Sequence, residues 1–254
     1  MQTTERINRI KNWIIDYCKN MPIEAKTLVI GVSGGIDSSV TSTLCALTGK
    51  KTIILSMPIN QIKDQHSLSL KHQEWLKNKF KNVEGHIIKL DNVFDNFKNS
   101  LSNFKNNHGL ANSRARLRMT TLYQVAASNN GIVVGTGNKV EDFGVGFYTK
   151  YGDGGVDISP IADCTKTQVW EMGKSLGIIK EIIEAEPTDG LWDDGRTDTN
   201  QLGMSYDELE KAMMDKTSEG YSKYLEIRKK NLHKMNPIPA VSYTHLTLPT
   251  KRIV

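Results

Sequence analysis

The sequence predicts an α/β protein built on a doubly wound, mainly parallel β-sheet flanked by helices. Three observations support this fold class. Four short apolar segments rich in β-branched residues occur between residues 28 and 136, helix-like segments lie between them, and two of the four end in glycine-bearing loops. Ligands of such sheets bind at the carboxyl ends of the strands, so we expect both loops at one edge of the sheet.

The elements are expected in the following order. Apolar residues at helical spacing predict an amphipathic helix over residues 4–20, which Pro22 ends. The predicted strands are LVIGV at 28–32, TIILSM at 52–57, HIIKL at 86–90 and IVVGT at 132–136. The predicted helices between and after the strands cover residues 38–47, 65–79, 111–127, 166–176, 180–185, 205–215 and 219–234.

Length and composition fit one substantial core, and we expect a single domain over residues 1–239. The 254 residues are 38% hydrophobic and 24% charged. Their mean hydropathy is −0.41. No apolar run approaches the ~20 residues that a membrane span needs, and the N-terminus lacks a signal-peptide core. The three widely spaced cysteines favour reduced thiols over a disulfide framework or zinc cluster. We therefore expect a cytoplasmic protein without a membrane partner.

The net charge of +5 permits attraction to polyanions, but basic and acidic residues are mixed along the chain. No RNA-binding pattern of interleaved aromatic and basic residues occurs. The charge therefore suits an anion of nucleotide size, and we expect no nucleic-acid partner.

Residues 28–39, LVIGVSGGIDSS, form the more unusual of the two loops. A strand, a glycine turn and a helix start bring unpaired N–H groups and the helix dipole to one point, which favours an anion. A Walker loop would add a lysine, whereas this loop contains Asp37. A carboxylate beside a polyphosphate is repulsive unless a divalent cation bridges them. Either Asp37 holds magnesium, or it caps the helix and the loop binds no phosphate.

The string SGGIDSS resembles the loop of the N-type ATP pyrophosphatases, or PP-loop enzymes. Four further blocks follow in the order and spacing of the ammonia-dependent NAD synthetases: NSRARLRM at 112–119, GTGNKVED at 135–142, TKYGDGGVDISPIADCTKTQV at 149–169 and PTDGLWDDGRTDTNQLG at 187–203. The resemblance covers about residues 4–239. It implies an adenine nucleotide alpha hydrolase-like, Rossmann-like fold and a homodimer. The implied reaction adenylates the carboxylate of deamido-NAD with ATP and displaces AMP with ammonia, which forms NAD in the last step of its biosynthesis.

The resemblance also implies roles for individual residues. Those implied for ATP, the co-substrate, are Gly31, Ser33, Gly34, Gly35, Asp37, Ser38, Ser39, Thr136, Lys166 and Thr188. Asp37 and Lys166 are the implied catalytic residues, and Asp37 and Glu141 are the implied ligands of Mg²⁺, the expected cofactor. Read without the resemblance, Glu141 belongs to a solvated acidic pair with Asp142, and each lysine is a surface residue. The two threonines then have an ordinary capping role.

A second set of residues is implied for deamido-NAD, namely Arg116, Lys150, Asp157, His233 and Lys234. Without the resemblance, Asp157 is a turn residue, and the last two cations complement a helix dipole. The 3.6-residue period predicts a buried stripe formed by Ala115, Met119, Leu122 and Ala126. Arg116 flanks this stripe and could reach a groove at a dimer interface, whereas we interpret Arg114 as solvated.

Residues 240–254, AVSYTHLTLPTKRIV, do not resemble the usual end of the family. We interpret them as a tail of doubtful origin, a sequencing or cloning artefact outside the fold. The resemblance uses nearly the whole chain and leaves no room for a glutaminase domain, so free ammonia is the expected nitrogen donor.

Two other functions stay open. Another PP-loop enzyme, for tRNA thiolation or GMP synthesis, would share SGGIDSS but is disfavoured by the stretch TKYGDGGVD. A non-catalytic nucleotide-binding module would bind ATP without turnover, and the intact Asp37, Glu141, Lys150 and Lys166 disfavour it. We assign no function to His66, His72 and Trp192.

Overall fold

A computed structural model describes residues 1–61, 63–104, 106–188, 190–191 and 196–241. The described chain contains a four-stranded parallel sheet in the order β3-β2-β1-β4. The strands are β1 (Thr27–Gly31), β2 (Lys51–Ser56), β3 (Val83–Ile87) and β4 (Gly131–Val133). Val29 at the centre of β1 pairs with Ile53 of β2 and with Val133 of β4. The predicted fold class is confirmed.

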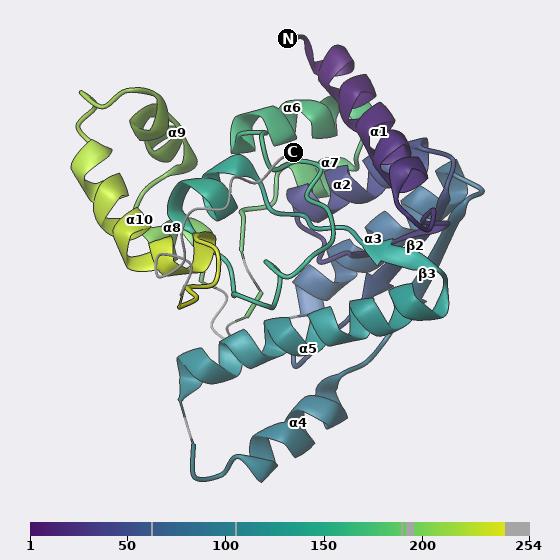
Figure 1. The fold of residues 1–254 in the computed structure, drawn as a ribbon, viewed down its shortest axis with the longest axis horizontal. Coiled ribbons are helices and arrows are strands. Elements are labelled where there is room, and N and C mark those ends of the chain that lie inside the picture. Colours follow the sequence, from purple (N-terminus) through teal and green to yellow (C-terminus); the bar gives the residue numbers. More distant parts are fainter. Residues whose placement is uncertain (62, 105, 189, 192–195, 242–254) are drawn as a thin grey trace, which may run out of the picture.

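Helices cover both faces of the sheet (Figure 1). One face contacts α1 (Thr3–Asn20), α2 (Ile36–Leu47), α3 (Lys63–Lys79) and α6 (Lys166–Leu176). The other face contacts α4 (Asp91–Ser100) and α5 (Asn107–Ser128). Successive strand residues point to opposite faces, so Leu28 and Ile30 pack in the first cluster while Val29 packs in the second. Burial on both faces explains why β1 and most of β2 are apolar rather than alternating, whereas the edge strand β3 is largely exposed and polar.

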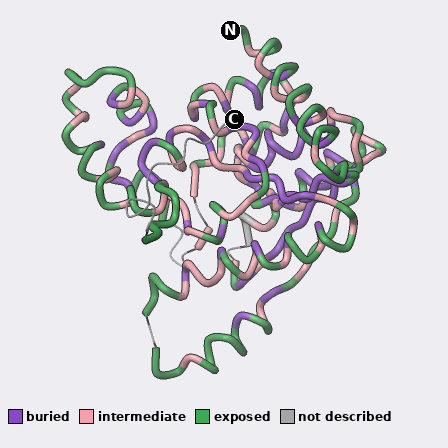
Figure 2. The backbone as a smooth tube through the Cα atoms, in the orientation of Figure 1, coloured by how far each residue is buried: buried purple, intermediate pink, exposed green. Residues whose placement is uncertain are grey.

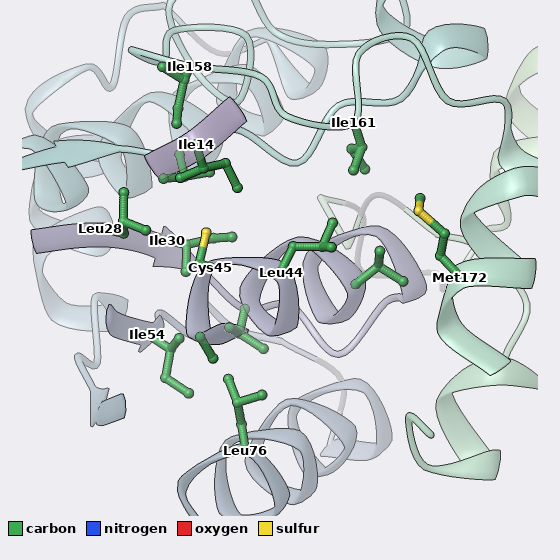
Figure 3. Packing of buried hydrophobic residues seen from close by; sticks show 14 of the residues in the cluster. Ile14, Leu28, Ile30, Leu44, Cys45, Ile54, Leu76, Ile158, Ile161 and Met172 are labelled. Atoms are coloured by element: carbon green, nitrogen blue, oxygen red, sulfur yellow. The ribbon is translucent and has the colours of Figure 1, made fainter. Parts of the chain in front are cut away.

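Helix α2 lies at the centre of the larger core. Figure 3 shows Leu44 and Cys45 of α2 between the strand residue Ile54, Leu76 of α3 and Met172 of α6. Leu44 and Cys45 are fully buried. Because its neighbours pack closely around it, α2 and the loop before it are held in a fixed position.

A third apolar cluster forms a lobe beside the sheet. It is built from the π-helix η1 (Lys139–Val145), α8 (Asp198–Leu202), α9 (Tyr206–Met214) and α10 (Tyr221–Met235). The lobe projects on the left of Figure 1, and Figure 2 shows exposed outer turns on its helices. The remaining helix of the described chain, α7 (Lys180–Ile183), follows α6.

The structure confirms most predicted elements and corrects others. The strand expected at 86–90 is β3 at Val83–Ile87, because residues from Val83 onward pair with β2 from Thr52 onward. The strand expected at 132–136 ends at Val133, after which Val134 forms an isolated bridge with Ile158. Helices α4, η1 and α8 were not predicted. The segments of η1 and α8 are short. In α4 the apolar residues Val93, Phe94 and Phe97 do lie at helical spacing, and this signal was missed.

The cysteines Cys18, Cys45 and Cys164 are buried free thiols, as expected. Within the described ranges, no helix is long and apolar enough to cross a membrane. Residues 242–254, most of the tail of doubtful origin, lie outside the described residues, so that interpretation stays a prediction.

His72 of α3 is a buried titratable group in the core. Its side chain is inaccessible to solvent, and its Nε2 lies 2.9 Å from Ser42 Oγ of α2. Burial lowers its pKa to about 4, from an ordinary value of 6.5. His72 is therefore neutral in the folded protein at neutral pH.

This burial predicts a pH dependence of stability. As the pH falls below about 6.5, the unfolded chain takes up a proton at His72 before the folded protein does, so stability is lost down to about pH 4. The loss is ~3 kcal/mol, from ~1.4 kcal/mol for each unit of the pKa difference. In urea unfolding followed by circular dichroism, His72→Gln should abolish this part of the decline.

The exposed His86 provides the matched control, and His86→Gln should keep the wild-type pH dependence. If both variants lost as much stability as the wild type when the pH falls, burial of His72 would not be the cause of that loss.

Candidate active site

The loop between β1 and α2 forms an open anion site. Gly34 has a φ of +93°, a left-handed conformation that glycine adopts without strain. Helix α2 begins at Ile36 after Gly35, and no described side chain caps its first turn. The first N–H groups of α2 therefore remain available to an anion. The alternative in which Asp37 caps the helix is wrong, because Asp37 lies within the first turn and its carboxylate is bonded elsewhere.

The loop after β4 continues into η1, a π-helix that contains Glu141. Asn138 begins this helix: its side-chain oxygen accepts hydrogen bonds from the N–H groups of Val140 and Glu141, each at 3.0 Å. The amide nitrogen of the same side chain donates to Asp37 Oδ1 at 3.0 Å. One buried asparagine thus links the two loops that the sequence predicted at the same edge. π-Helical turns often occur at functional sites.

Lys166 joins both carboxylates from a third segment. A capping box between Thr165 and Gln168 begins α6, and it makes Lys166 the first residue of that helix. The ammonium of Lys166 lies 2.6 Å from Asp37 Oδ2 and 2.7 Å from Glu141 Oε1. The Lys166 side chain is only 2% exposed. The surface-lysine and solvated-acid alternatives are therefore wrong for Lys166 and Glu141.

The charges in this group depend on one another. Burial alone would lower the pKa of Lys166, but the two carboxylates outweigh it and raise the pKa, so the ammonium stays charged. Burial raises the pKa of Asp37, and Lys166 opposes that shift. Burial acts on Glu141 in the same way, yet Lys166 together with Tyr206, whose hydroxyl donates at 2.5 Å, holds the pKa of Glu141 below its ordinary value. With both carboxylates ionised, the three charges would sum to −1, a balance that would favour a further cation.

These residues line a cavity of about 730 Å³ at the carboxyl edge of the sheet. A cavity of this volume suits a ligand of nucleotide size. Nine of the ten residues predicted for ATP line it, namely Gly31, Ser33, Gly34, Gly35, Asp37, Ser38, Thr136, Lys166 and Thr188. The tenth, Ser39, is fully buried, and its hydroxyl donates to Gly35 O.

Four of the five residues predicted for deamido-NAD lie together next to this cavity, and we call them the basic group: Arg116, Lys150, His233 and Lys234. Arg116 Nε donates to Lys150 O at 3.2 Å, and Lys150 Nζ donates to His233 O at 3.4 Å. The described lining of the cavity includes none of them. Asp157, the fifth, is placed apart at the end of β4, where it accepts hydrogen bonds from Val133 N and the Tyr123 hydroxyl.

The comparison with known proteins identifies the family. A family model described as NAD synthase matches residues 6–242. The chain belongs to the NAD synthase family. A curated NH₃-dependent NAD⁺ synthetase of Carboxydothermus hydrogenoformans is 34% identical over 247 residues, covering 93% of this chain and 96% of that protein.

Solved structures of NAD synthase relatives have the same fold. The structure of an NMN synthetase from Francisella tularensis has a TM-score of 0.88 at 32% identity, and covers 96% of this chain and 100% of its own. The NH₃-dependent NAD synthetase of Campylobacter jejuni, in complex with nitrate, has a TM-score of 0.77 at 25% identity, covering 95% and 100%. The family and the fold implied by the sequence resemblance are therefore confirmed.

Two residues near this candidate site had been missed or misread. Arg114 is not solvated: it lies over the Phe94 ring, 5.0 Å from its centroid, and donates to Leu191 O at 2.5 Å. Arg118 lines the cavity and donates to Met57 O at 3.0 Å. The partners of both arginines are distant in sequence, so helical spacing alone does not reveal these contacts. Trp192 lies outside the described residues.

The residues present fit a magnesium ion. Asp37 and Glu141 both reach one cationic atom, Lys166 Nζ, so their carboxylates converge on a common point. Mg²⁺ in nucleotide sites is usually held by one or two carboxylates together with substrate phosphates. In keeping with this, no cluster of three or more potential metal-ligating side chains occurs among the described residues.

The buried ion pairs predict a large effect on stability. Lys166→Met would leave two buried carboxylates facing each other without a cation, which should lower the free energy of unfolding by ~3–5 kcal/mol at pH 8. Protonation of a carboxylate removes that repulsion, so the loss should shrink towards pH 5. Urea unfolding at both pH values measures the difference.

Lys139 of η1 provides the matched control, because it pairs with Asp163 at 2.8 Å on the protein surface. Lys139→Met should cost at most ~1 kcal/mol, as exposed pairs do. Equal losses from the two variants would contradict a special role of the buried pair.

Proposed function

We propose that this chain catalyses the ATP-dependent amidation of deamido-NAD with ammonia, which yields NAD, AMP and pyrophosphate. One observation supports this most strongly: Asp37, Glu141 and Lys166 meet at the end of an uncapped phosphate loop. Membership in a family whose curated members include NH₃-dependent NAD⁺ synthetases supports the substrates.

The phosphate loop and Lys166 would act on ATP. The first N–H groups of α2 bind phosphate oxygens, and the charged Lys166 stabilises the negative charge that develops as pyrophosphate leaves. Lys166 donates two of its three N–H bonds to the carboxylates, so the third can be donated to a phosphate oxygen. Thr136 and Thr188 both line the cavity, where their hydroxyls could hydrogen-bond the nucleotide.

The chemistry proceeds in two displacements. The carboxylate oxygen of deamido-NAD attacks the α-phosphorus of ATP, and the bond to pyrophosphate breaks. The nitrogen of ammonia then attacks the acyl carbon of this adenylate, AMP leaves, and the nitrogen loses a proton to give the amide. A free carboxylate is a poor electrophile, so adenylation is the step that makes amide formation possible.

Asp37 and Glu141 would hold the magnesium ion. When bound, Mg²⁺ neutralises phosphate charge and favours departure of the pyrophosphate. Asn138 fixes the orientation of Asp37 and the start of the helix that contains Glu141.

The basic group would bind the phosphates of deamido-NAD beside the cavity. Hydrogen bonds link Arg116 to Lys150 and Lys150 to His233, and all four residues are at least partly exposed, so their side chains could reach phosphate oxygens. We assign Asp157 to the same substrate, from the other side of the 149–157 loop. We further propose that the protein is a homodimer in the cytoplasm, with the exposed Arg116 near the subunit interface. Sedimentation velocity of the purified protein can test the dimeric state.

A second candidate is amidation of nicotinate mononucleotide to NMN. The observation that favours it is the likeness to the Francisella tularensis protein, whose structure is described as an NMN synthetase. The reacting carboxylate is the same in both substrates, so the ATP site would serve either. The two differ in the adenylyl half, which only deamido-NAD has.

One assay separates these functions. Purified protein with ATP, Mg²⁺ and ammonium is given deamido-NAD or nicotinate mononucleotide, and AMP, pyrophosphate and the amide product are measured. A higher kcat/KM with deamido-NAD is expected. A higher value with the mononucleotide would select the second candidate.

The same assay tests the other functions. If no pyrophosphate were released, the chain would be a binding module, and pyrophosphate release that depends on tRNA or xanthylate would indicate another PP-loop enzyme. Faster product formation with glutamine than with ammonium would refute ammonia as the donor.

The basic group predicts a selective change in substrate binding. Lys150→Met removes a charged contact worth ~1.5–3 kcal/mol, so the KM for deamido-NAD should rise about 10- to 100-fold. The KM for ATP should stay within about twofold, because Lys150 lies outside the cavity lining. Steady-state kinetics with each substrate varied in turn measures both values.

The exposed Lys229 of α10 is the matched control, and Lys229→Met should change neither KM. A parallel rise of both KM values in Lys150→Met would contradict a specific role in binding deamido-NAD.

A further inference from the structure

Tyr206, the first residue of α9, is a buried tyrosine that the proposed reaction leaves without a role. A capping box between Ser205 and Glu208 fixes the start of α9. The Tyr206 ring packs edge-on against Trp170, with ring centroids 5.9 Å apart, and belongs to the apolar cluster of the lobe. Its position is therefore set by packing on one side and by the helix start on the other.

The hydroxyl of Tyr206 lies between two carboxylates. It is 2.5 Å from Glu141 Oε1 and 3.0 Å from Asp198 Oδ2. A hydroxyl has one proton to donate, and the shorter distance indicates that Glu141 is the principal acceptor. Burial, together with the charge of Glu141, raises the pKa of Tyr206, so the hydroxyl keeps its proton.

Tyr206 and Lys166 both bind the same oxygen of Glu141. Lys166 Nζ and the Tyr206 hydroxyl both donate to Oε1, and neither bond involves Oε2. Asp37 is held in a comparable way, since Asn138 donates to Oδ1 while Lys166 donates to Oδ2. Each carboxylate thus has one neutral donor in addition to the ammonium they share.

We propose that Tyr206 is a positioning residue that holds Glu141 in the orientation needed to bind the metal ion. This inference rests on the proposed function in one respect, the assignment of Glu141 as a ligand of Mg²⁺. The Tyr206 hydroxyl is the second donor that holds Oε1, and it would keep this oxygen in place even if an ATP phosphate drew the Lys166 ammonium away. Glu141 Oε2 then stays directed at the cation. Donors behind a ligating carboxylate contribute to metal affinity in this way.

Tyr206→Phe tests the inference, because it removes one oxygen and keeps the ring against Trp170. Mn²⁺ replaces Mg²⁺ as an observable probe, and its binding is titrated by electron paramagnetic resonance in the presence of the unreactive analogue α,β-methylene-ATP. Mn²⁺ binding should weaken about 10-fold, the lower end of the range for groups behind metal ligands. Affinity for the analogue without metal should stay within about twofold. Neither measurement needs deamido-NAD. The inference about Tyr206 can therefore fail while the proposed reaction stands, and the proposed reaction can fail while the inference stands.

Two further variants separate positioning from a general structural effect. Tyr224→Phe alters a buried tyrosine of the same cluster, on α10, and should leave Mn²⁺ affinity unchanged. In a Glu141→Gln background, Tyr206→Phe should have no additional effect, because it acts through that carboxylate.

Three outcomes would overturn the inference: wild-type Mn²⁺ affinity in Tyr206→Phe, the same loss in Tyr224→Phe, or a full additional loss in the Glu141→Gln background. Failure of Tyr206→Phe alone to fold would also overturn it, because the tyrosine would then be structural.

Discussion

The buried ammonium of Lys166 is the constraint on which the site depends. A charged group without water is costly unless opposite charges and hydrogen bonds surround it, so Lys166 is tolerable only where Asp37 and Glu141 meet it. These partners lie 129 and 25 residues away along the chain. Folding therefore brings together the start of α2, the helix η1 and the start of α6. The same contacts form the candidate active site.

The topology of the sheet makes this meeting possible. β1 lies between β2 and β4, so the phosphate loop after β1 and the loop before η1 leave neighbouring strands at the same edge. The lobe then fixes η1 from its other end. Arg228 and Asn231 of α10 donate to the carbonyl groups of Gly144 and Val145 at the end of η1. The C-terminal helices, distant from the sheet, thereby help to place Glu141.

The sequence predicts those features that depend on local patterns. The buried face of α5, the strands and the loop with Asp37 follow from periodicity and glycine placement. The contact of Tyr206 with Glu141 cannot be predicted from such patterns, because 65 residues separate the two and the segment around Tyr206 resembles any capped helix. Arg114 was misread for a related reason. Its aromatic partner Phe94 lies in α4, a helix that was not predicted although Val93, Phe94 and Phe97 lie at helical spacing, and nothing in the sequence pairs α4 with Arg114.

The π-helical form of η1 has a consequence for how this sequence can change. A π-helix closes its hydrogen bonds over five residues rather than four, so η1 contains a residue that an α-helix spanning the same gap would not need. Deleting one residue between 139 and 145 would let the segment relax to an α-helix, and the flanking residues could keep their places because that helix needs one residue fewer over the same gap. The side chains within the segment would shift by up to ~100° about the helix axis, and Glu141 is one of them. The spacing from Asn138 to Gly146 is therefore a stricter requirement than the identity of most residues within it.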